Sequence, residues 1–189
     1  MSPVYSLDTP FSRESVKGLK AGDRVLVNGV IYTARDTAHR RFMAAIAAGQ
    51  RLPFELSGAV IYYAGPTPAP PGRPIGSIGP TTAGRMDAYT PELLKRGLAA
   101  MIGKGLRSQE VRLACVEHQA VYLAATSTAA LLAGCVEEAE VIAYEDLGPE
   151  AVRRLVVRDF PATVIIDTRG DDYYKLGRQT YATTRSTDD

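Results

Sequence analysis

A long proline- and glycine-rich stretch, residues 65–89, sets the tightest limit on the architecture of this chain. It follows an apolar run, Ala59–Tyr63, that is typical of a buried strand, and it shows neither helical nor strand periodicity. Loops of this length in compact domains are usually functional or disordered, and the closely spaced prolines favour order because each one fixes its own backbone. We therefore expect a rigid, irregular loop at the end of a buried strand.

The second half of this loop reads Gly-Pro-Thr-Thr-Ala-Gly-Arg-Met-Asp at residues 79–87, and another Gly-Pro-Thr stands at residues 65–67. Thr81 and Thr82 carry hydroxyls that can donate or accept hydrogen bonds, and Arg85 carries a planar fork that matches a carboxylate. Any one of them alone is more typical of a structural loop with a salt-bridged arginine. Together they predict a site for a small anion.

A second cationic group is predicted at the start of a helix that has Asp36 or Thr37 as its N-cap and that Gly49 stops. Arg35 and His39 lie at or just before its first turn, where unpaired peptide N–H groups favour an anion. His39 could serve as an acid or orient a neighbour, or it could be a half-buried helix histidine.

Two further residues are ambiguous. Lys104 lies between two glycines, which leaves room for a ligand but is equally typical of a solvated lysine at a helix end. Asp87 could hold Arg85 or a threonine in place, or it could cap a turn. The sequence contains no P-loop, no dinucleotide-binding fingerprint and no zinc-ligand spacing.

Alternating strand and helix patterns predict a single α/β or α+β domain. Residues 24–33 predict a hairpin that turns at Asn28-Gly29, since this pair tolerates the backbone of a tight turn. A helix is predicted from Thr90 to residues 103–105, with Leu93, Leu94, Leu98 and Met101 on its inner face. Further strands are predicted at residues 111–116, 120–125, 140–144 and 163–167, and further helices at residues 126–135 and from Pro149.

Composition excludes several function classes. The 189 residues carry a net charge of +1, so no global attraction draws the chain to nucleic acid or to an anionic membrane. No apolar run approaches the ~20 residues that span a bilayer. Cys115 and Cys135 lack metal-ligand spacing and are predicted to be reduced, buried thiols, which fits a cytoplasmic location. We predict one domain over residues 1–177 and a polar tail over residues 178–189.

The block at residues 79–87 and several others resemble the β subunit, or C-terminal domain, of class I fumarases and L(+)-tartrate dehydratases. The other blocks are residues 35–40, 65–72, 75–78, 89–91, 97–105, 143–151 and 159–162. Ala124–Thr128 departs from the family, in which we expect a glycine-rich turn; such a change would bear on specificity.

The resemblance implies a swivelling β/β/α domain that closes over a dicarboxylate. It implies a partner α subunit in which three cysteines hold a [4Fe–4S] cluster, so that this chain binds no metal itself, and an α₂β₂ assembly. The implied activity is the reversible hydration of fumarate to (S)-malate. Two alternatives remain open: an L(+)-tartrate dehydratase subunit that forms oxaloacetate, and a non-catalytic module that binds dicarboxylates.

The resemblance also implies roles for single residues. Thr81 matches the proposed catalytic base, and the substrate-binding positions are matched by Arg35, Thr82, Arg85 and Lys104. His39 matches a histidine of the same block, and Asp87 is a further candidate for an orienting or acidic group. A threonine hydroxyl is a poor base in water, so Thr81 would need an activating neighbour and a dry site.

Overall fold

Within residues 3–182, the part of the chain that this computed structural model describes, seven strands form one sheet in the order β1-β2-β3-β4-β5-β7-β6. The strands β1 to β5 are mutually parallel, and β7 runs antiparallel to its neighbours. The bounds are β1 Val4–Asp8, β2 Arg24–Thr33, β3 Val60–Tyr62, β4 Ala100–Gly103, β5 Val121–Ala125, β6 Val136–Ala143 and β7 Val152–Ile166. The predicted mixed α/β class is confirmed.

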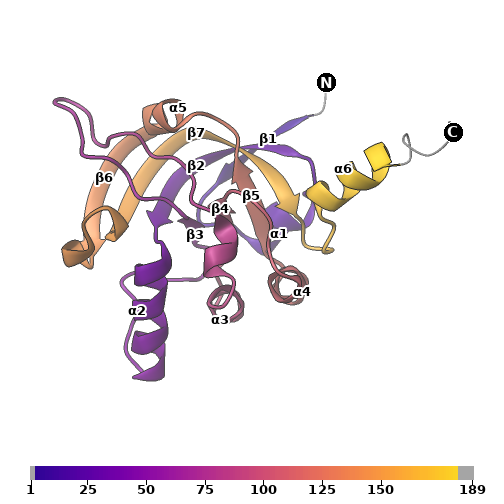
Figure 1. Cartoon of the computed structure of the whole chain (residues 1–189), viewed down its shortest axis with the longest axis horizontal. Coiled ribbons are helices and arrows are strands. Elements are labelled where there is room, and N and C mark those ends of the chain that lie inside the picture. The colour runs from indigo at the N-terminus through magenta and orange to yellow at the C-terminus, as the bar shows by residue number, and fades with distance from the viewer. Residues whose placement is uncertain (1–2, 183–189) are drawn as a thin grey trace, which may run out of the picture.

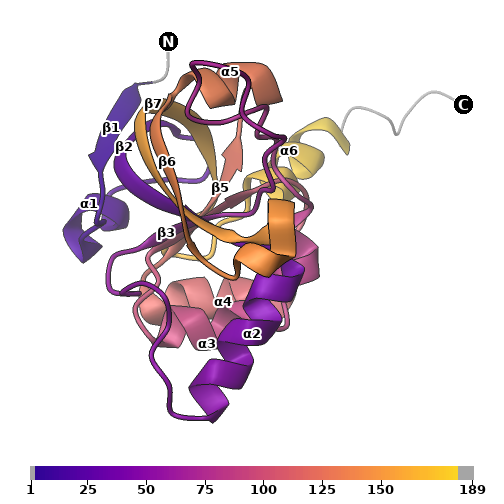
Figure 2. The same cartoon turned by 90° about the vertical axis from the view of Figure 1, so that its left-hand side faces the viewer.

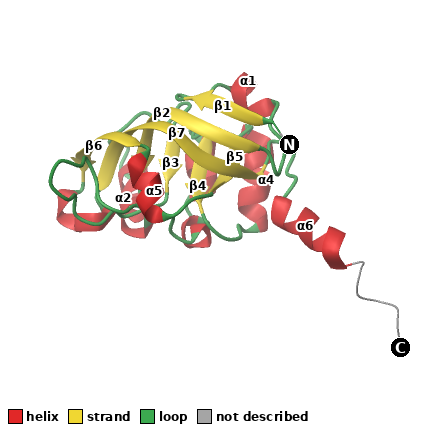
Figure 3. Cartoon of the chain, turned by 90° about the horizontal axis from the view of Figure 1, so that it is seen from above, coloured by secondary structure: helices red, strands yellow, loops and turns green. Residues whose placement is uncertain are grey.

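The sheet closes on itself because β7 also pairs with β2. The ring runs β2-β3-β4-β5-β7 and back to β2, with β1 and β6 attached outside it. A closed ring leaves few unpaired strand edges, and the long β7 makes this closure possible because it reaches β2, β5 and β6. Figure 3 shows the strands gathered across the body of the molecule, with the helices around them.

The helices α2, α3 and α4 lie side by side against the outer face of β3, β4 and β5 (Figures 1 and 2). Helix α6 extends away from the body (Figures 1 and 3). The α-helices are α1 Arg13–Lys17, α2 Asp36–Ala47, α3 Thr90–Lys95, α4 Gln109–His118, α5 Ala129–Gly134 and α6 Tyr173–Ala182. Two 3₁₀ helices are η1 Ala83–Met86 and η2 Glu145–Glu150.

Strand β3 separates two hydrophobic cores. Val60 and Tyr62 point into the core inside the ring, whereas Ile61 and Tyr63 pack against the helices. Alternate side chains of a strand point to opposite faces, so a strand buried on both faces reads as a continuous apolar run. This is why the apolar run at residues 59–63 predicted a buried strand.

The predicted hairpin at residues 24–33 is wrong. These residues form the single strand β2, and the register against β7 shifts between Val27 and Gly29. Gly29 has φ +95°, so the Asn-Gly pair forms a bulge instead of a turn. Local sequence could not separate the two, since both need a positive φ at glycine.

The predicted strand at residues 111–116 is a helix. Ser108 caps it by accepting a hydrogen bond from the Val111 N–H, and Val111, Ala114 and Cys115 are its buried residues. Their i, i+3, i+4 spacing is helical, and the apolar character of the run concealed it.

The helix that begins at Thr90 is shorter than predicted and ends at Lys95. Gly97 adopts φ +105°, which ends the helical path, and Met101 lies in strand β4. Lys104 therefore follows a strand and not a helix.

Near the C-terminus, Pro149 lies inside η2 and does not open a helix, and the run after it belongs to β7. The predicted tail at residues 178–189 overlaps the end of α6, and residues 183–189 lie outside the described part. Among the described residues, no helix combines the length and apolar composition that a bilayer crossing requires.

Candidate active site

The candidate residues gather at the carboxyl ends of three adjacent parallel strands. Arg35 comes just after β2, Gly65 follows β3, and Lys104 follows β4. In sheets of this kind the carboxyl edge is where ligands bind, because the loops there can present side chains to one point. A side-chain carbon at Gly65 would lie 3.2 Å from the Arg35 Nη1 atom, so the missing side chain lets Arg35 lie against the loop.

The proline-rich loop folds back on itself, which sets its two Gly-Pro-Thr copies next to each other. Ala64 forms a bridge with Pro80, and the Thr67 N–H donates to the Ser77 carbonyl at 3.0 Å. Gly76 is required here, since a side-chain carbon would lie 2.3 Å from the Thr67 Oγ1 atom. The prediction of an irregular, ordered loop is confirmed.

Thr81 is held between the ends of β3 and β4 by its backbone. Its N–H donates to the Tyr63 carbonyl at 2.6 Å, and its carbonyl accepts from the Lys104 N–H at 3.2 Å. Thr82 forms a parallel bridge with Lys104. The structure thus brings three candidates, Thr81, Thr82 and Lys104, together. Within the described residues the Thr81 hydroxyl has no hydrogen-bond partner, so this chain shows no group that activates it.

Arg35 and Arg85 are brought together by the carboxylate of Asp36, which the sequence pattern indicated only as a candidate helix cap. The Arg85 Nε atom donates to the Asp36 Oδ1 atom at 2.7 Å, and the Arg35 Nε atom lies 4.0 Å from the Asp36 Oδ2 atom. No local pattern could have shown this contact, since Asp36 and Arg85 are 49 positions apart.

The predicted anion position at the start of α2 is already filled from within the chain. Glu150 lies with its Oε1 atom 3.4 Å from the Arg35 Nη2 atom, and its Oε2 atom accepts from the Thr37 N–H at 3.3 Å. Two carboxylates, Asp36 and Glu150, therefore balance the two arginines. The candidate site is less cationic than a count of Arg35, Arg85 and Lys104 suggests.

Asp87 does not hold Arg85 or a threonine. Its Oδ1 atom accepts from the Arg107 Nε atom at 2.6 Å, and its Oδ2 atom accepts from the Ser108 N–H at 2.7 Å. The Arg107 side chain is 0% exposed, donates to Thr90 at 2.7 Å and lies over the ring of Tyr63. The sequence carried no signal for this buried arginine. Asp87 instead joins η1 to the segment that follows Lys104.

His39 is fully buried, not half-buried, and it lies beneath Arg35. Its Nδ1 atom is 2.8 Å from the Arg35 carbonyl, which can only accept, so Nδ1 carries the proton. Burial lowers the pKa of His39 to about 4, with the charge of Arg107 adding to this and the Arg35 hydrogen bond opposing it. The neutral ring therefore supports the Arg35 backbone and is not an acid at neutral pH.

This buried histidine predicts a loss of stability in acid. The unfolded chain binds the proton with a pKa of 6.5 and the folded chain with a pKa of about 4, so the unfolded state takes up more protons between these values. We expect the His39 contribution to the free energy of unfolding to fall by about 2–3 kcal/mol from pH 7 to pH 4.5. Urea unfolding at both pH values should show a smaller loss for His39→Gln than for the wild type; equal losses would contradict the assignment.

The cysteines of this chain do not fit an iron–sulphur site. Cys115 is buried among the helices, where burial raises the pKa of its thiol to about 12, whereas Cys135 is partly exposed beside the other core, which corrects the prediction that both are buried. In the described part of the chain, no three His, Cys, Asp or Glu side chains are grouped to hold a metal ion.

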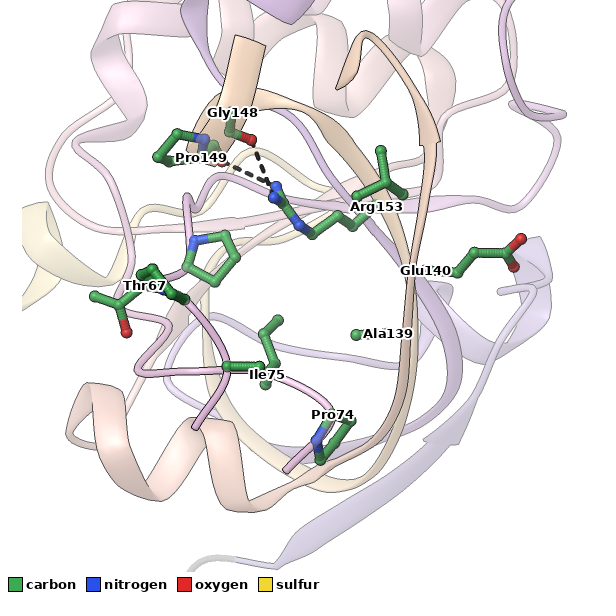
Figure 4. A pocket seen from close by; sticks show the side chains of 12 residues that line it. Thr67, Pro74, Ile75, Ala139, Glu140, Gly148, Pro149 and Arg153 are labelled. Atoms are coloured by element: carbon green, nitrogen blue, oxygen red, sulfur yellow. Dashed lines mark hydrogen bonds between the residues drawn. The ribbon is translucent and has the colours of Figure 1, made fainter. Parts of the chain in front are cut away.

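A pocket of about 390 Å³ lies beside the candidate residues, between the proline-rich loop, β6 and η2 (Figure 4). Arg153 forms one wall and donates to the carbonyls of Gly148 and Pro149. None of the predicted site residues lines this pocket.

The family model described as the fumarase C-terminus matches residues 3–177. This chain belongs to that family. One similar protein is the anaerobic class I fumarate hydratase of Escherichia coli (strain K12). It is 41% identical to this chain over 155 residues, which cover 80% of this chain and 28% of that protein. The aerobic class I fumarate hydratase of Salmonella typhimurium (strain LT2) is 40% identical over 155 residues, which cover 27% of its length. This chain thus spans less than a third of these enzymes.

Another similar protein has nearly the same length as this chain. It is the putative L(+)-tartrate dehydratase subunit beta of Methanocaldococcus jannaschii, 39% identical over 171 residues, which cover 87% of this chain and 88% of that protein.

Proposed function

We propose that this chain is the β subunit of a hydro-lyase that interconverts fumarate and (S)-malate. The observation that carries the proposal is the convergence of two hydroxyls and three cations at the carboxyl edge of three strands. Membership of the fumarase C-terminus family supports the reaction class.

The proposal assigns the rest of the active site to an α subunit. A relative of matching length is named a subunit beta, and the two fumarate hydratases described above are more than three times as long as the part that aligns with this chain. The [4Fe–4S] cluster and its three cysteines belong to the α subunit in this proposal, since the two thiols here do not fit one. We further propose an α₂β₂ assembly in the cytoplasm and a swivelling movement of this domain over the substrate.

The proposal gives a role to five of the candidate site residues. Arg35, Arg85 and Lys104 bind the substrate carboxylates, and Thr82 adds a hydrogen bond. Thr81 removes or returns the carbon-bound proton. Because no described residue activates its hydroxyl, we propose that the α subunit completes its surroundings and excludes water.

The alternative substrate is L(+)-tartrate, which the name of the Methanocaldococcus jannaschii relative favours. Tartrate carries two hydroxyls on a saturated four-carbon skeleton where fumarate has a double bond, and the described cations would bind the two carboxylates of either molecule.

The proposal is tested by purifying the chain alone and with the α subunit, after anaerobic iron–sulphur reconstitution. We expect the pair to convert fumarate to malate, measured by the loss of absorbance of the fumarate double bond, and the chain alone to be inactive. A reconstituted pair that turned over neither fumarate nor tartrate would refute the hydro-lyase proposal. Tight fumarate binding by the lone chain would favour a non-catalytic dicarboxylate-binding module instead.

Replacing Arg85 should weaken the carboxylate clamp. We expect Arg85→Ala to lower kcat/KM by about 10²–10³, mainly through KM, because a substrate carboxylate loses a charged hydrogen bond. Arg85→Lys should recover only part of the loss, since an ammonium group cannot form the two parallel hydrogen bonds that a guanidinium forms with a carboxylate. Arg96→Ala is the matched control, because Arg96 makes a similar 2.7 Å ion pair on the surface of α3. Equal kinetics for Arg85→Ala and Arg96→Ala would remove Arg85 from the site.

A further inference from the structure

Asp36 connects the two arginines of the candidate site. It is the first residue of α2 and accepts from the Nε atom of Arg85 on η1 at 2.7 Å. Its second oxygen lies 4.0 Å from the Arg35 Nε atom, which is longer than a hydrogen bond. The carboxylate therefore holds Arg85 firmly and Arg35 loosely.

The surroundings separate this contact from an ordinary surface ion pair. The Asp36 side chain is 24% exposed, and its Oδ2 atom is buried without a hydrogen-bond partner, as is the Arg35 Nε atom. A buried polar atom without a partner is costly, so stability alone does not explain this arrangement.

The way Asp36 binds Arg85 leaves the other end of the guanidinium free. Only the Nε atom of Arg85 donates to a described residue, and the side chain is 50% exposed. The two terminal nitrogens can still form the paired hydrogen bonds that guanidinium makes with a ligand carboxylate. A flexible arginine fixed at Nε loses less freedom when the ligand arrives.

We propose that Asp36 is a positioning residue that fixes Arg85 beside Arg35 for binding one carboxylate of the substrate. This inference rests on the proposed hydro-lyase function and deepens it. The opposite role is that Asp36 occupies Arg85 until a substrate carboxylate displaces it. The two roles predict opposite changes in KM when the Asp36 charge is removed.

The kinetic test uses the assembled pair with Asp36→Ala, Asp36→Asn and Glu92→Gln. Glu92 is the matched control, since it accepts from Arg96 Nε at the same 2.7 Å on the surface of α3. We expect KM for fumarate to rise roughly tenfold in Asp36→Ala while kcat changes less than about threefold. Asp36→Asn should show a smaller rise, because its amide oxygen still accepts, and Glu92→Gln should match the wild type. A lower or unchanged KM in both Asp36 variants would overturn the proposal.

A second readout does not depend on activity. In ¹⁵N NMR of the full chain, the Arg85 Nε–H should exchange with water slowly in the wild type and faster in Asp36→Ala, while Arg96 is unchanged. Equal Arg85 exchange in the two proteins would refute the positioning contact. A wild-type pair without dicarboxylate turnover would instead refute the proposed function, and the Arg85 signal would still show whether Asp36 holds it.

Discussion

Thr81→Ala should lower kcat of the assembled enzyme by about 10²–10⁴ while leaving KM within a few-fold of the wild type, a range typical for the loss of a general base. The fold should be preserved, because Thr81 is held by main-chain hydrogen bonds to Tyr63 and Lys104 that do not involve its side chain. Thr81→Ser keeps the hydroxyl and should retain activity within about tenfold of the wild type.

Thr67 provides the matched control for this experiment. It is the exposed threonine of the first Gly-Pro-Thr copy, and the loop places it beside the second copy without joining it to β3 or β4. Thr67→Ala should leave kcat and KM near their wild-type values. If Thr81→Ala turns over as fast as Thr67→Ala, the carbon-bound proton is moved by another group.

Arg107→Met should produce the largest loss of stability. The variant removes the partner of Asp87 in an ion pair whose arginine is fully buried and whose carboxylate is 18% exposed, and breaking a buried pair from one side costs up to about 3–5 kcal/mol. For a chain of this size we expect Tm to fall by roughly 6–20 °C, measured by calorimetry or circular dichroism.

The control for Arg107 is the exposed Arg96. Arg96→Met breaks a surface pair with Glu92 and should change the free energy of unfolding by no more than about 0.5 kcal/mol. Adding Asp87→Asn to Arg107→Met should cost less than the sum of the two single changes, because the pair is lost only once. A loss below about 1 kcal/mol for Arg107→Met would show that the pair does not hold η1 in place.

Short-range patterns explain which parts of the fold could be predicted. Strand β3, the proline-rich loop and the presence of α2 followed from apolar runs, prolines and helical periodicity, all of which act over a few residues. The predicted N-cap of α2, Asp36 or Thr37, is wrong: the cap is Arg35, and Asp36 is already helical. The failures at Asn28-Gly29 and residues 111–116 arose where one local pattern fits two structures. At Asn28-Gly29 a distant segment decided, since β7 pairs with β2 on both sides of the bulge. At residues 111–116 the helical spacing of Val111, Ala114 and Cys115 was present but was concealed by the continuous apolar run.

The candidate site shows the same division. The chemistry of Thr81, Thr82, Arg85 and Lys104 was visible in the sequence, but the choice of ion-pair partners was not. With 22 basic and 21 acidic side chains, a guanidinium has many carboxylates it could meet, and composition does not select one. The pairs of Arg85 with Asp36 and of Arg107 with Asp87 depend on which segments the sheet brings together.

By itself, the sequence determined a rigid loop with two hydroxyls and an arginine at the end of a buried strand, because glycine, proline and side-chain chemistry act locally. Only the tertiary structure decided that β7 closes the ring, that Thr82 pairs with Lys104, and that Asp36 and Glu150 balance the site arginines. These contacts join residues far apart in the chain, so no local sequence pattern encodes them.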